Sequence, residues 1–527
     1  MPLTTELSPS GCSFFAETPS SIFAPEQFVG DEALMIQTAE QFSRSEVLPL
    51  LERLDKQEDG LMPGLIRHAG ELGLCGVDTS DAFGGLGLSK TIAARILEFM
   101  SLNGSFSVTY GITSGISQVG LSLFGTDKQK QQYLPLLASG EWIGAYALSE
   151  PNSGSDALSA TTRADLVGDK YVLNGTKMWI SNAKWADLFL VMAKVDGDKF
   201  SAFLVEKDFP GVTVSREEHK MGLKGSSTAR LILDNAEVPA ENLLHQVGQG
   251  HHVAFNALNI GRFKLAAMSI GPARDAIGLA AAYAVDRRQF GQPISSFGLI
   301  QKKFAMMAAW FYAAESMIYR TGAMIDAAFD LWGGTVEGNR KAAEEFSVEC
   351  SACKVFSTEI ESLIIDEAIQ VFGGYGFTEE FPIARHYRDA RVSRIYEGTN
   401  EINRLFIADR LARKIRDGKI LGTAVGDSFL SELAGKALAL NVKDQVSLGA
   451  VSDLLLLSYA EQSTRLRSMQ SKGHGAALHA TVLPWLNARG AEAFQLLTGA
   501  AVTLPQCEQT DIAALAEAVY QNRRPIS

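Results

Sequence analysis

The sequence predicts a mainly helical α+β protein. Helical periodicity fills most of its 527 residues, and one block of short β-rich runs interrupts it. A chain of this length also predicts several domains, at about 100 to 200 residues each. In chain order we expect an N-terminal tail over residues 1–30, an N-terminal helical domain over 31–144, a middle β-domain over 145–248, a C-terminal helical bundle over 249–415 and an appended helical domain over 416–527.

The segment before the β-rich block has the apolar spacing of helices. Ala33, Ile36 and Phe42 lie near helical spacing, and breaks such as Pro63-Gly64 divide the segment into separate helices. Residues 1–25 are polar and lack this spacing, so we expect a loose tail there.

The β-domain is predicted from short runs rich in β-branched and aromatic residues. Tyr171–Leu173 and Leu188–Val191 are two such runs, and the turn-forming pairs Asn174-Gly175 and Asp196-Gly197 separate neighbouring runs. Alternating runs and turns of this kind favour one compact β-domain between two helical regions.

Helical periodicity returns after the β-rich block. Residues 300–325 and 341–372 are too long and too rich in alanine to be strands, so they predict a bundle of long helices. After Arg416 the chain is rich in Ala, Leu and Gly. Further helices are expected there near residues 427–440, 448–467 and 512–522.

The charge balance excludes one class of partner. The chain has 48 basic and 60 acidic side chains, for a formal net charge of −12. A protein that wraps a phosphate backbone needs a basic surface, so nucleic acid is not expected as a partner.

Cysteine usage predicts a reducing compartment, and we expect the cytoplasm of a bacterial cell. The five cysteines are odd in number and form no disulfide framework. Cys350 and Cys353 form the only CxxC motif, and no second pair completes a metal site. We interpret them as small core residues, with redox or metal chemistry as the alternative, and expect no metal.

No targeting or membrane-spanning segment is predicted. The first basic residue is Arg44, so residues 1–43 lack the basic character of a signal or transit peptide. The uncharged apolar run from Phe304 to Ala314 is about half of the ~20 residues that a spanning helix needs.

A polar loop follows the predicted start of the β-domain. Residues 146–156, YALSEPNSGSD, combine an aromatic ring, hydroxyls and a Gly-Ser turn. Such a loop can offer NH groups and hydroxyls to a phosphate or to a ring heteroatom. A plain polar turn is the alternative. The candidate residues are Tyr146, Leu148, Ser149 and Ser155.

The run NGTKMWISN, residues 174–182, places Trp179 on a predicted strand beside Ser181. An indole ring next to a hydroxyl suits a planar cofactor, which can stack on the ring and accept a hydrogen bond at its rim. A tryptophan that belongs to the core is the alternative.

Two further runs suit a pyrophosphate. Arg287-Arg288-Gln289-Phe290-Gly291 ends a helix with paired cations, and a solvated helix end is the alternative, which by itself the run favours. Gln370 to Gly376 contains Gly373 and Gly374, which lack a Cβ that would keep a phosphate away from the backbone. The run is not GxGxxG, so a Rossmann site is disfavoured.

About 20 residues later, a carboxylate lies just before a predicted helix. In residues 394–401, RIYEGTNE, Glu397 stands between an aromatic residue and Gly398. Partial burial could tune its pKa for acid–base work. A carboxylate that favours the helix dipole is the alternative interpretation.

Taken together, these segments resemble the acyl-CoA dehydrogenase family over residues 31–415. The order helix, β, helix and the separations of the motifs match that family, and residues 259–263 and 296–304 with the C-terminal extension are most like its very-long-chain branch. The matching runs are YALSEPNSGSD, NGTKMWISN, MGLKGSSTARLILDNAEVP, RRQFG, QVFGGYGF and YEGTNEINR.

The resemblance implies FAD held noncovalently between the β-domain and the C-terminal helical domain. Ser149 and Ser181 would bond to the flavin rim, where threonine is commoner in the family, and Arg287 and Gln370 would reach the FAD of another subunit. An oligomer, with a dimer favoured, is therefore implied. The residues matched to FAD binding are Tyr146, Leu148, Ser149, Ser155, Trp179, Ser181, Arg287, Phe290, Gln370, Gly373, Gly374, Thr399 and Glu401.

The resemblance also implies the reaction, in which an acyl-CoA becomes a trans-2-enoyl-CoA in fatty acid β-oxidation. Glu397 would be the base that removes the Cα proton, while its own NH polarises the thioester, a hydride passes to flavin N5, and an electron-transfer flavoprotein receives the electrons. Relatives of the isovaleryl type carry their base before the helix arginine, where this chain has Gly261. The residues matched to the substrate are Ser155, Asn259, Arg262 and Gly398.

Other functions stay open at this point. The first alternative is a flavin oxidase or monooxygenase with the same fold, which would pass the electrons to oxygen. The second alternative is not an enzyme but an assembly or scaffold protein, because one relative of the very-long-chain type has a role in the assembly of a respiratory complex.

We expect long straight-chain acyl-CoAs as substrates. Gly111 and Gly115 lie on one face of a predicted helix, where larger residues could plug the substrate pocket. Close packing of that helix against a neighbour is the alternative.

The resemblance implies peripheral membrane contact by the appended domain, through an apolar stripe that includes Leu454, Leu455 and Leu457. Packing of that stripe within the protein is the alternative.

Overall fold

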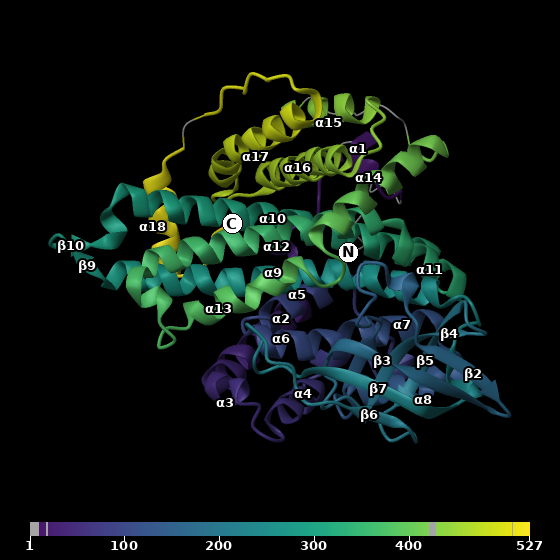
Figure 1. The fold of residues 1–527 in the computed structure, drawn as a ribbon. Coiled ribbons are helices and arrows are strands. Elements are labelled where there is room, and N and C mark those ends of the chain that lie inside the picture. Colours follow the sequence, from purple (N-terminus) through teal and green to yellow (C-terminus); the bar gives the residue numbers. More distant parts are fainter. Residues whose placement is uncertain (1–9, 17–18, 421–427, 509) are drawn as a thin grey trace. The chain divides into compact units, whose positions relative to one another are not determined.

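The computed structural model describes residues 10–16, 19–420, 428–508 and 510–527. They fall into two compact units. The sheet unit comprises Val29–Lys264 and Trp332–Glu344, and the bundle unit falls within Met1–Phe28, Leu265–Leu331 and Glu345–Ser527. The expected mainly helical α+β class is confirmed (Figure 1).

The sheet unit begins with short helices, and three of those given below have a capping side chain. Ser89 accepts a hydrogen bond from the NH of Ile92 at 3.2 Å, Asn103 accepts one from the NH of Phe106 at 2.8 Å, and Thr126 forms a capping box with Gln129, so α5, α6 and α8 begin where a free NH group finds an acceptor. The elements are α2 (Asp31–Phe42), the π-helical η2 (Ser43–Val47), α3 (Leu51–Asp55), α4 (Leu61–Glu71), α5 (Lys90–Met100), α6 (Gly104–Gly111), the π-helical η6 (Ile112–Ile116), α7 (Ser117–Phe124) and α8 (Asp127–Ala138).

An eight-stranded sheet follows within the described residues. Its order is β6-β7-β3-β2-β4-β5-β8, and β1 pairs in parallel with β4. The strands are β1 (Gly144–Ala147), β2 (Arg163–Val167), β3 (Lys170–Ser181), β4 (Leu188–Val195), β5 (Lys199–Glu206), β6 (Val212–Val214), β7 (Thr228–Pro239) and β8 (Leu243–Leu244).

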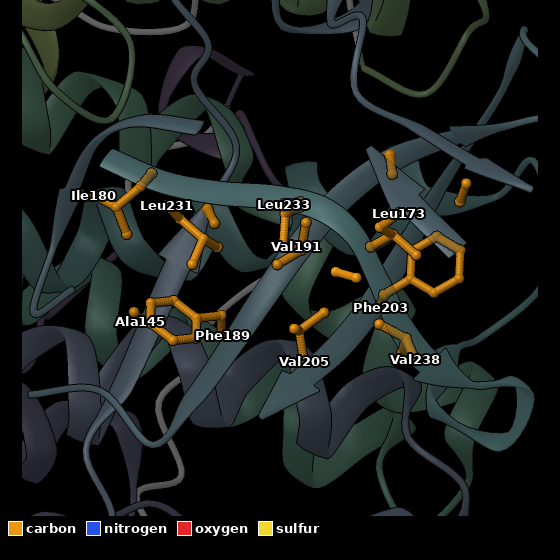
Figure 2. Packing of buried hydrophobic residues seen from close by; sticks show 14 of the residues in the cluster. Ala145, Leu173, Ile180, Phe189, Val191, Phe203, Val205, Leu231, Leu233 and Val238 are labelled. Atoms are coloured by element: carbon orange, nitrogen blue, oxygen red, sulfur yellow. The ribbon is translucent and has the colours of Figure 1, made fainter. Parts of the chain in front are cut away.

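One face of this sheet is a dry hydrophobic core (Figure 2). Phe189 and Val191 of β4, Phe203 of β5 and Leu231 of β7 have no exposed surface. Burial of side chains of this size supplies about 1.5 to 3 kcal/mol each, which makes the sheet a rigid support for the loops at its edge.

The bundle unit is built from long helices (Figure 1). Helix α9 (Gly250–Asp286) crosses the boundary of the two units at Lys264, and Arg274 from its second half pairs with Glu315 of α10 at 2.9 Å. The other elements are α1 (Ser13–Ala16), the hairpin of β9 (Arg288–Gln289) and β10 (Gln292–Pro293), α10 (Gly298–Trp332), α12 (Ser347–Phe372), the 3-10 helix η10 (Gly373–Phe377), α13 (Ile383–Ala390) and α14 (Asn400–Arg416); α11 (Val336–Glu345) precedes α12.

The expectation of a loose tail over residues 1–25 is wrong for the part of it that the structure describes. Gly11 donates its NH to Glu345 at 2.8 Å, and the buried ring of Phe14 packs on Tyr459 with centroids 4.7 Å apart. Ile22 exchanges two hydrogen bonds with the amide of Gln470, at 2.8 and 2.9 Å. Apolar residues scattered through a polar segment carry no periodicity, so the sequence pattern missed this contact.

The appended helices are α15 (Phe429–Ala439), α16 (Gln445–Gln470), α17 (Gly475–Thr498) and α18 (Ile512–Asn522). Part of the predicted helix at 427–440 lies outside the described residues. Helix α17 was not predicted, because Pro484 and Gly490 interrupt its pattern. Gly490 lets α17 lie close to α15, because a Cβ there would be 2.2 Å from Cδ2 of Leu430 and that side chain would have to shift.

The predicted apolar stripe of α16 does not form an exposed face. Leu454, Leu455 and Leu457 are all buried, which supports the alternative of packing within the protein. None of the described helices has both the length and the hydropathy that are needed to cross a bilayer.

Candidate functional site

The loop after β1 lies against β3 in the sheet unit. Met178 donates its NH to the carbonyl of Ser149 at 2.8 Å, and the Lys177 ammonium donates to the carbonyl of Leu148 at 3.2 Å. Tyr146 is half-buried, and its hydroxyl donates to the Ala254 carbonyl at 3.4 Å. The fold therefore brings the candidates Tyr146, Leu148 and Ser149 to the strand that carries Trp179.

A buried ion pair holds this loop in place. Lys177 Nζ lies 2.7 Å from Glu150 Oε1, and both side chains are buried. Glu150 also accepts hydrogen bonds from the NH groups of Thr161 and Thr162, at 2.6 and 3.0 Å. Burial raises the pKa of Glu150, but the charge of Lys177 and these hydrogen bonds outweigh burial and bring the pKa to about 2.

Trp179 lies at an irregularity of β3. The pairing of β3 with β7 shifts register between Lys177 and Ile180, and Trp179 within the shift has φ +61°. Its indole is 57% exposed, whereas Ile180 beside it is in the core. A bulge re-aims a side chain out of the ordinary alternation, and here it presents a flat aromatic face at the surface of the sheet unit.

The end of β3 is anchored by Asn182. Its NH donates to Ser227 at 3.0 Å, and its amide donates to the Gly144 carbonyl, where β1 begins, at 2.9 Å. Ser181 remains in register opposite Thr228 of β7 and is half-buried. The candidate residues of β1 and β3 are therefore held by one hydrogen-bonded frame.

The substrate candidates of the sheet unit differ in exposure. Asn259 and Arg262 on α9 are buried, with Arg262 Nη1 3.5 Å from Asn259 Oδ1. Ser155 is exposed in the loop after β1, and the structure gives no contact that brings it to Trp179.

In the bundle unit, the β9–β10 hairpin explains the Arg-Arg-Gln-Phe-Gly run. Its two-residue turn is Phe290 at φ +53° and Gly291 at φ +81°, the backbone of the type I′ turn that matches strand twist. Phe290 is 93% exposed as a result. Arg287 is exposed as well, and its guanidinium lies 5.5 Å from the ring centre of Tyr375.

Helix α12 ends at the glycine-rich run. Gly373 has φ +62° at its C-terminus, and a Cβ at Gly373 or Gly374 would meet nothing within 4 Å, so both present open backbone. Gln370 is exposed on the last turn of α12. The contact of Arg287 with Tyr375 places the hairpin beside this run, so the structure groups Arg287, Phe290, Gln370, Gly373 and Gly374.

Glu397 occupies a strained turn before α14. It has φ +58°, in the left-handed region that a glutamate seldom adopts, and Gly398 follows at φ +81°. Such a conformation costs about 1 to 3 kcal/mol and persists only where the surroundings impose it. Thr399 then caps α14 by accepting the NH of Ile402 at 3.2 Å. Glu401 in the first turn is exposed.

Two buried side chains impose this turn. Lys354 Nζ on α12 donates to the Gly398 carbonyl at 2.9 Å and to Asn400 Oδ1 at 2.7 Å. Asn403 donates to the same Gly398 carbonyl at 2.8 Å and to the Thr399 carbonyl at 3.1 Å. Gly398 is therefore fixed through its carbonyl.

Glu361 is a buried carboxyl beside the same turn. Burial raises its pKa well above the usual value; hydrogen bonding by Ser393 opposes this, and the charge of Asp389 adds to it. Ser393 already donates its hydroxyl hydrogen to the Ala390 carbonyl at 2.7 Å, so it is poorly placed to donate to a carboxylate. The surroundings favour the neutral acid.

Sequence reasoning missed four of these residues as functional: Glu150, Lys177, Lys354 and Asn403. A lysine such as Lys177 inside a strand was the available signal, because a charge on a half-buried strand needs a partner. Within the described residues, no cluster of three or more His, Cys, Asp or Glu side chains is arranged to hold a metal.

The chain matches one family along most of its length. Residues 30–141 match "Acyl-CoA dehydrogenase, N-terminal domain", residues 145–236 match "Acyl-CoA dehydrogenase, middle domain" and residues 248–412 match "Acyl-CoA dehydrogenase, C-terminal domain". The chain therefore belongs to the acyl-CoA dehydrogenase family, a family of oxidoreductases, and the family and enzyme class expected from the motifs are confirmed.

Individual proteins that are similar to this chain belong to the same family. A probable acyl-CoA dehydrogenase of Bacillus subtilis is 49% identical over 76% of this chain and 69% of its own length. The rat mitochondrial very long-chain specific acyl-CoA dehydrogenase is 38% identical over 85% of this chain, but the match spans only 64% of that relative. A crystal structure of an acyl-CoA dehydrogenase complexed with FAD, from Bacillus anthracis, is 39% identical with a TM-score of 0.89 and covers 99% of this chain and 100% of that one.

Proposed function

We propose that the protein is an FAD-dependent acyl-CoA dehydrogenase that oxidises long straight-chain acyl-CoAs to trans-2-enoyl-CoAs in fatty acid β-oxidation, with Glu397 as the base. The observation that carries the proposal is the strained turn at Glu397, which Lys354 and Asn403 hold through the Gly398 carbonyl. Strain of this kind is maintained where function requires it.

The turn lets one residue act in two ways. The carboxylate of Glu397 accepts the Cα proton of the acyl-CoA, and its main-chain NH donates to the thioester carbonyl, which makes that proton more acidic. Because the turn is fixed, both groups are in place before the substrate binds.

The residues of the sheet unit fit a flavin. Trp179 presents an exposed indole at a bulge, and Ser149 lies on the loop that bonds to the neighbouring Met178. Ser149 and Ser181 can hydrogen-bond the rim of a ring that stacks on this indole. FAD, when bound, supplies the two-electron oxidation that protein side chains lack. The other residues matched to FAD binding in the sequence analysis are likewise proposed to contact the bound FAD.

Three finer assignments complete the proposal. Long acyl chains are supported by the small residues Gly111 and Gly115 near η6 and by the likeness to very-long-chain relatives. An electron-transfer flavoprotein is the proposed acceptor of the electrons.

A homodimer is the proposed oligomeric state. Phe290 and Phe377 are both more than 90% exposed, so they leave apolar surface that a second subunit could cover. Light scattering on the purified protein tests this oligomeric state.

The decisive variant is Glu397→Gln, which keeps the shape and the main-chain NH but cannot accept a proton. We expect normal FAD content and a normal spectral response to palmitoyl-CoA. Anaerobic flavin reduction, followed by stopped flow, should slow by about 10² to 10⁴.

Glu380→Gln is the control, because it makes the same change at an exposed site of the bundle unit. It should reduce its flavin at the wild-type rate. Near-normal reduction by Glu397→Gln would show that another group is the base, and a wild-type protein that no acyl-CoA reduces would refute the proposed function itself.

A further inference from the structure

A π-helical turn interrupts the helix that precedes the β-domain. It is η6 (Ile112–Ile116), between α6 and α7, and Gly115 within it has non-helical angles of φ −119° and ψ −105°. Single π-turns inside α-helices occur frequently at functional sites. This turn belongs to the segment whose small residues support the proposed preference for long acyl chains.

A buried lysine from another helix bonds to this turn. Lys264 on α9 donates from Nζ to the Ser114 carbonyl at 3.1 Å. Its stem lies beside the next residue, since a Cβ on Gly115 would meet Lys264 Cδ at 3.4 Å. Both Lys264 and Ser114 are buried. The irregular turn is thus bonded from outside its own helix.

The same ammonium is held by a carboxylate. Lys264 Nζ lies 3.0 Å from Asp78 Oδ1, and Lys90 Nζ lies 2.8 Å from Asp78 Oδ2. Burial raises the pKa of Asp78, but the charges of Lys264 and Lys90 outweigh it and hold the pKa well below its usual range. Asp78 is therefore an anion shared by two cations, and one of them, Lys264, contacts the Ser114 carbonyl.

Lys264 also sits on the helix that carries the substrate candidates. It follows Arg262 by two positions on α9, and Asn259 lies five positions before it. A shift of the Lys264 contact would therefore move η6 against the turn of α9 that carries Arg262.

We propose that Lys264, held by Asp78, is a positioning residue that fixes η6 and thereby sets the chain-length preference for acyl-CoAs. The inference rests on the function proposed above. Asp78 acts only through Lys264.

A purely structural ion pair makes a different prediction. It would lower stability and affect all substrates equally, whereas a positioning role at η6 changes the discrimination between chain lengths. The test therefore measures KM and kcat separately for butyryl-, octanoyl- and palmitoyl-CoA.

The test variant is Lys264→Met, which keeps the apolar stem and removes the ammonium. We expect the ratio of kcat/KM for palmitoyl-CoA to that for butyryl-CoA to fall at least about tenfold, mainly through KM, because a buried hydrogen bond from a charged group is lost. FAD content should stay at the wild-type level.

Lys90→Met is the matched control. It removes an equal charge from the same carboxylate, whereas Lys264 is the residue that bonds to the Ser114 carbonyl of η6, so the chain-length ratio of Lys90→Met should stay within about twofold of wild type. Equal ratios in Lys264→Met and wild type would overturn the inference, and so would an equal change in both variants. Failure of the wild type to oxidise any acyl-CoA would instead refute the proposed function.

A second variant covers the case in which Lys264→Met does not fold. Asp78→Asn leaves Lys264 present but weakens its hold, and it should change the chain-length ratio in the same direction. A folded Asp78→Asn variant with a wild-type ratio overturns the inference.

Discussion

Two buried glutamates, one in each unit, stand beside loops that carry the proposed chemistry, and they are accommodated in opposite ways. Glu150 in the sheet unit is ionised and lies 2.7 Å from the Lys177 ammonium. Glu361 in the bundle unit makes no ion pair with any residue that the structure describes, and its surroundings favour the neutral acid. Both side chains are buried.

The difference shows that burial alone does not decide the state of a carboxyl. A lysine within hydrogen-bond distance keeps Glu150 charged, and a charged pair orients the loop that carries Ser149. Where the neighbours are hydroxyls that donate elsewhere, the proton stays on Glu361. The first arrangement loses stability as the pH falls, and the second loses stability as the pH rises.

The largest expected effect is that of Glu150→Gln. The variant leaves the Lys177 ammonium buried without a counter-charge, and breaking a buried pair in this way costs about 3 to 5 kcal/mol. Urea unfolding should show the loss, and FAD content should fall because the loop at Ser149 is released. Glu237→Gln is the control, because Glu237 forms an exposed ion pair with Lys170 at 2.6 Å. This variant should change the free energy of unfolding and the FAD content little.

The pH dependence of the same pair comes next. Folding lowers the pKa of Glu150 to about 2, so its contribution is complete above the unfolded pKa near 4.5 and is lost as the pH falls toward 2. We expect a loss of up to about 3 kcal/mol over this window. Denaturant unfolding between pH 5 and pH 2.5 measures it. If the Glu150→Gln variant retained the wild-type slope, the ion pair would not be its source.

The smallest effect is expected for Glu361→Gln, because an amide replaces a group that is already neutral. At pH 6 the change in unfolding free energy should be below about 1 kcal/mol. A raised pKa means that the contribution of Glu361 is present below the unfolded pKa and is lost as the pH rises through the folded value. The free energy of unfolding of the Glu361→Gln variant should therefore rise relative to that of the wild type as the pH increases.

Thermal unfolding of both proteins at pH 6 and pH 9 tests this sign. A loss for Glu361→Gln as large as that for Glu150→Gln would break the comparison, because it would mean that Glu361 is charged and paired.

The sequence predicted the order of helical and β-rich regions, and it placed Glu397 and Trp179 in their motifs, because periodicity and local composition are properties of neighbouring residues. It did not predict the positive φ of either residue: that of Trp179 falls in a register shift between β3 and β7, and that of Glu397 precedes a carbonyl that a side chain of another helix holds. Lys354, which bonds to Gly398, is 44 residues away from it. The pair of Lys264 with Asp78 spans 186 residues, and no local pattern carries such a contact.

The contact of Ile22 with Gln470 has a consequence for synthesis. The two residues are 448 positions apart, so the first segment leaves the ribosome long before its partner exists. At about 5 to 20 residues per second, the interval is about 20 to 90 s. During that time Phe14 and Ile22, buried in the finished protein, have no partner on α16. The bundle unit therefore completes its assembly only after α16 has been synthesised, and a chaperone would have its longest opportunity to bind the N-terminal segment during this interval.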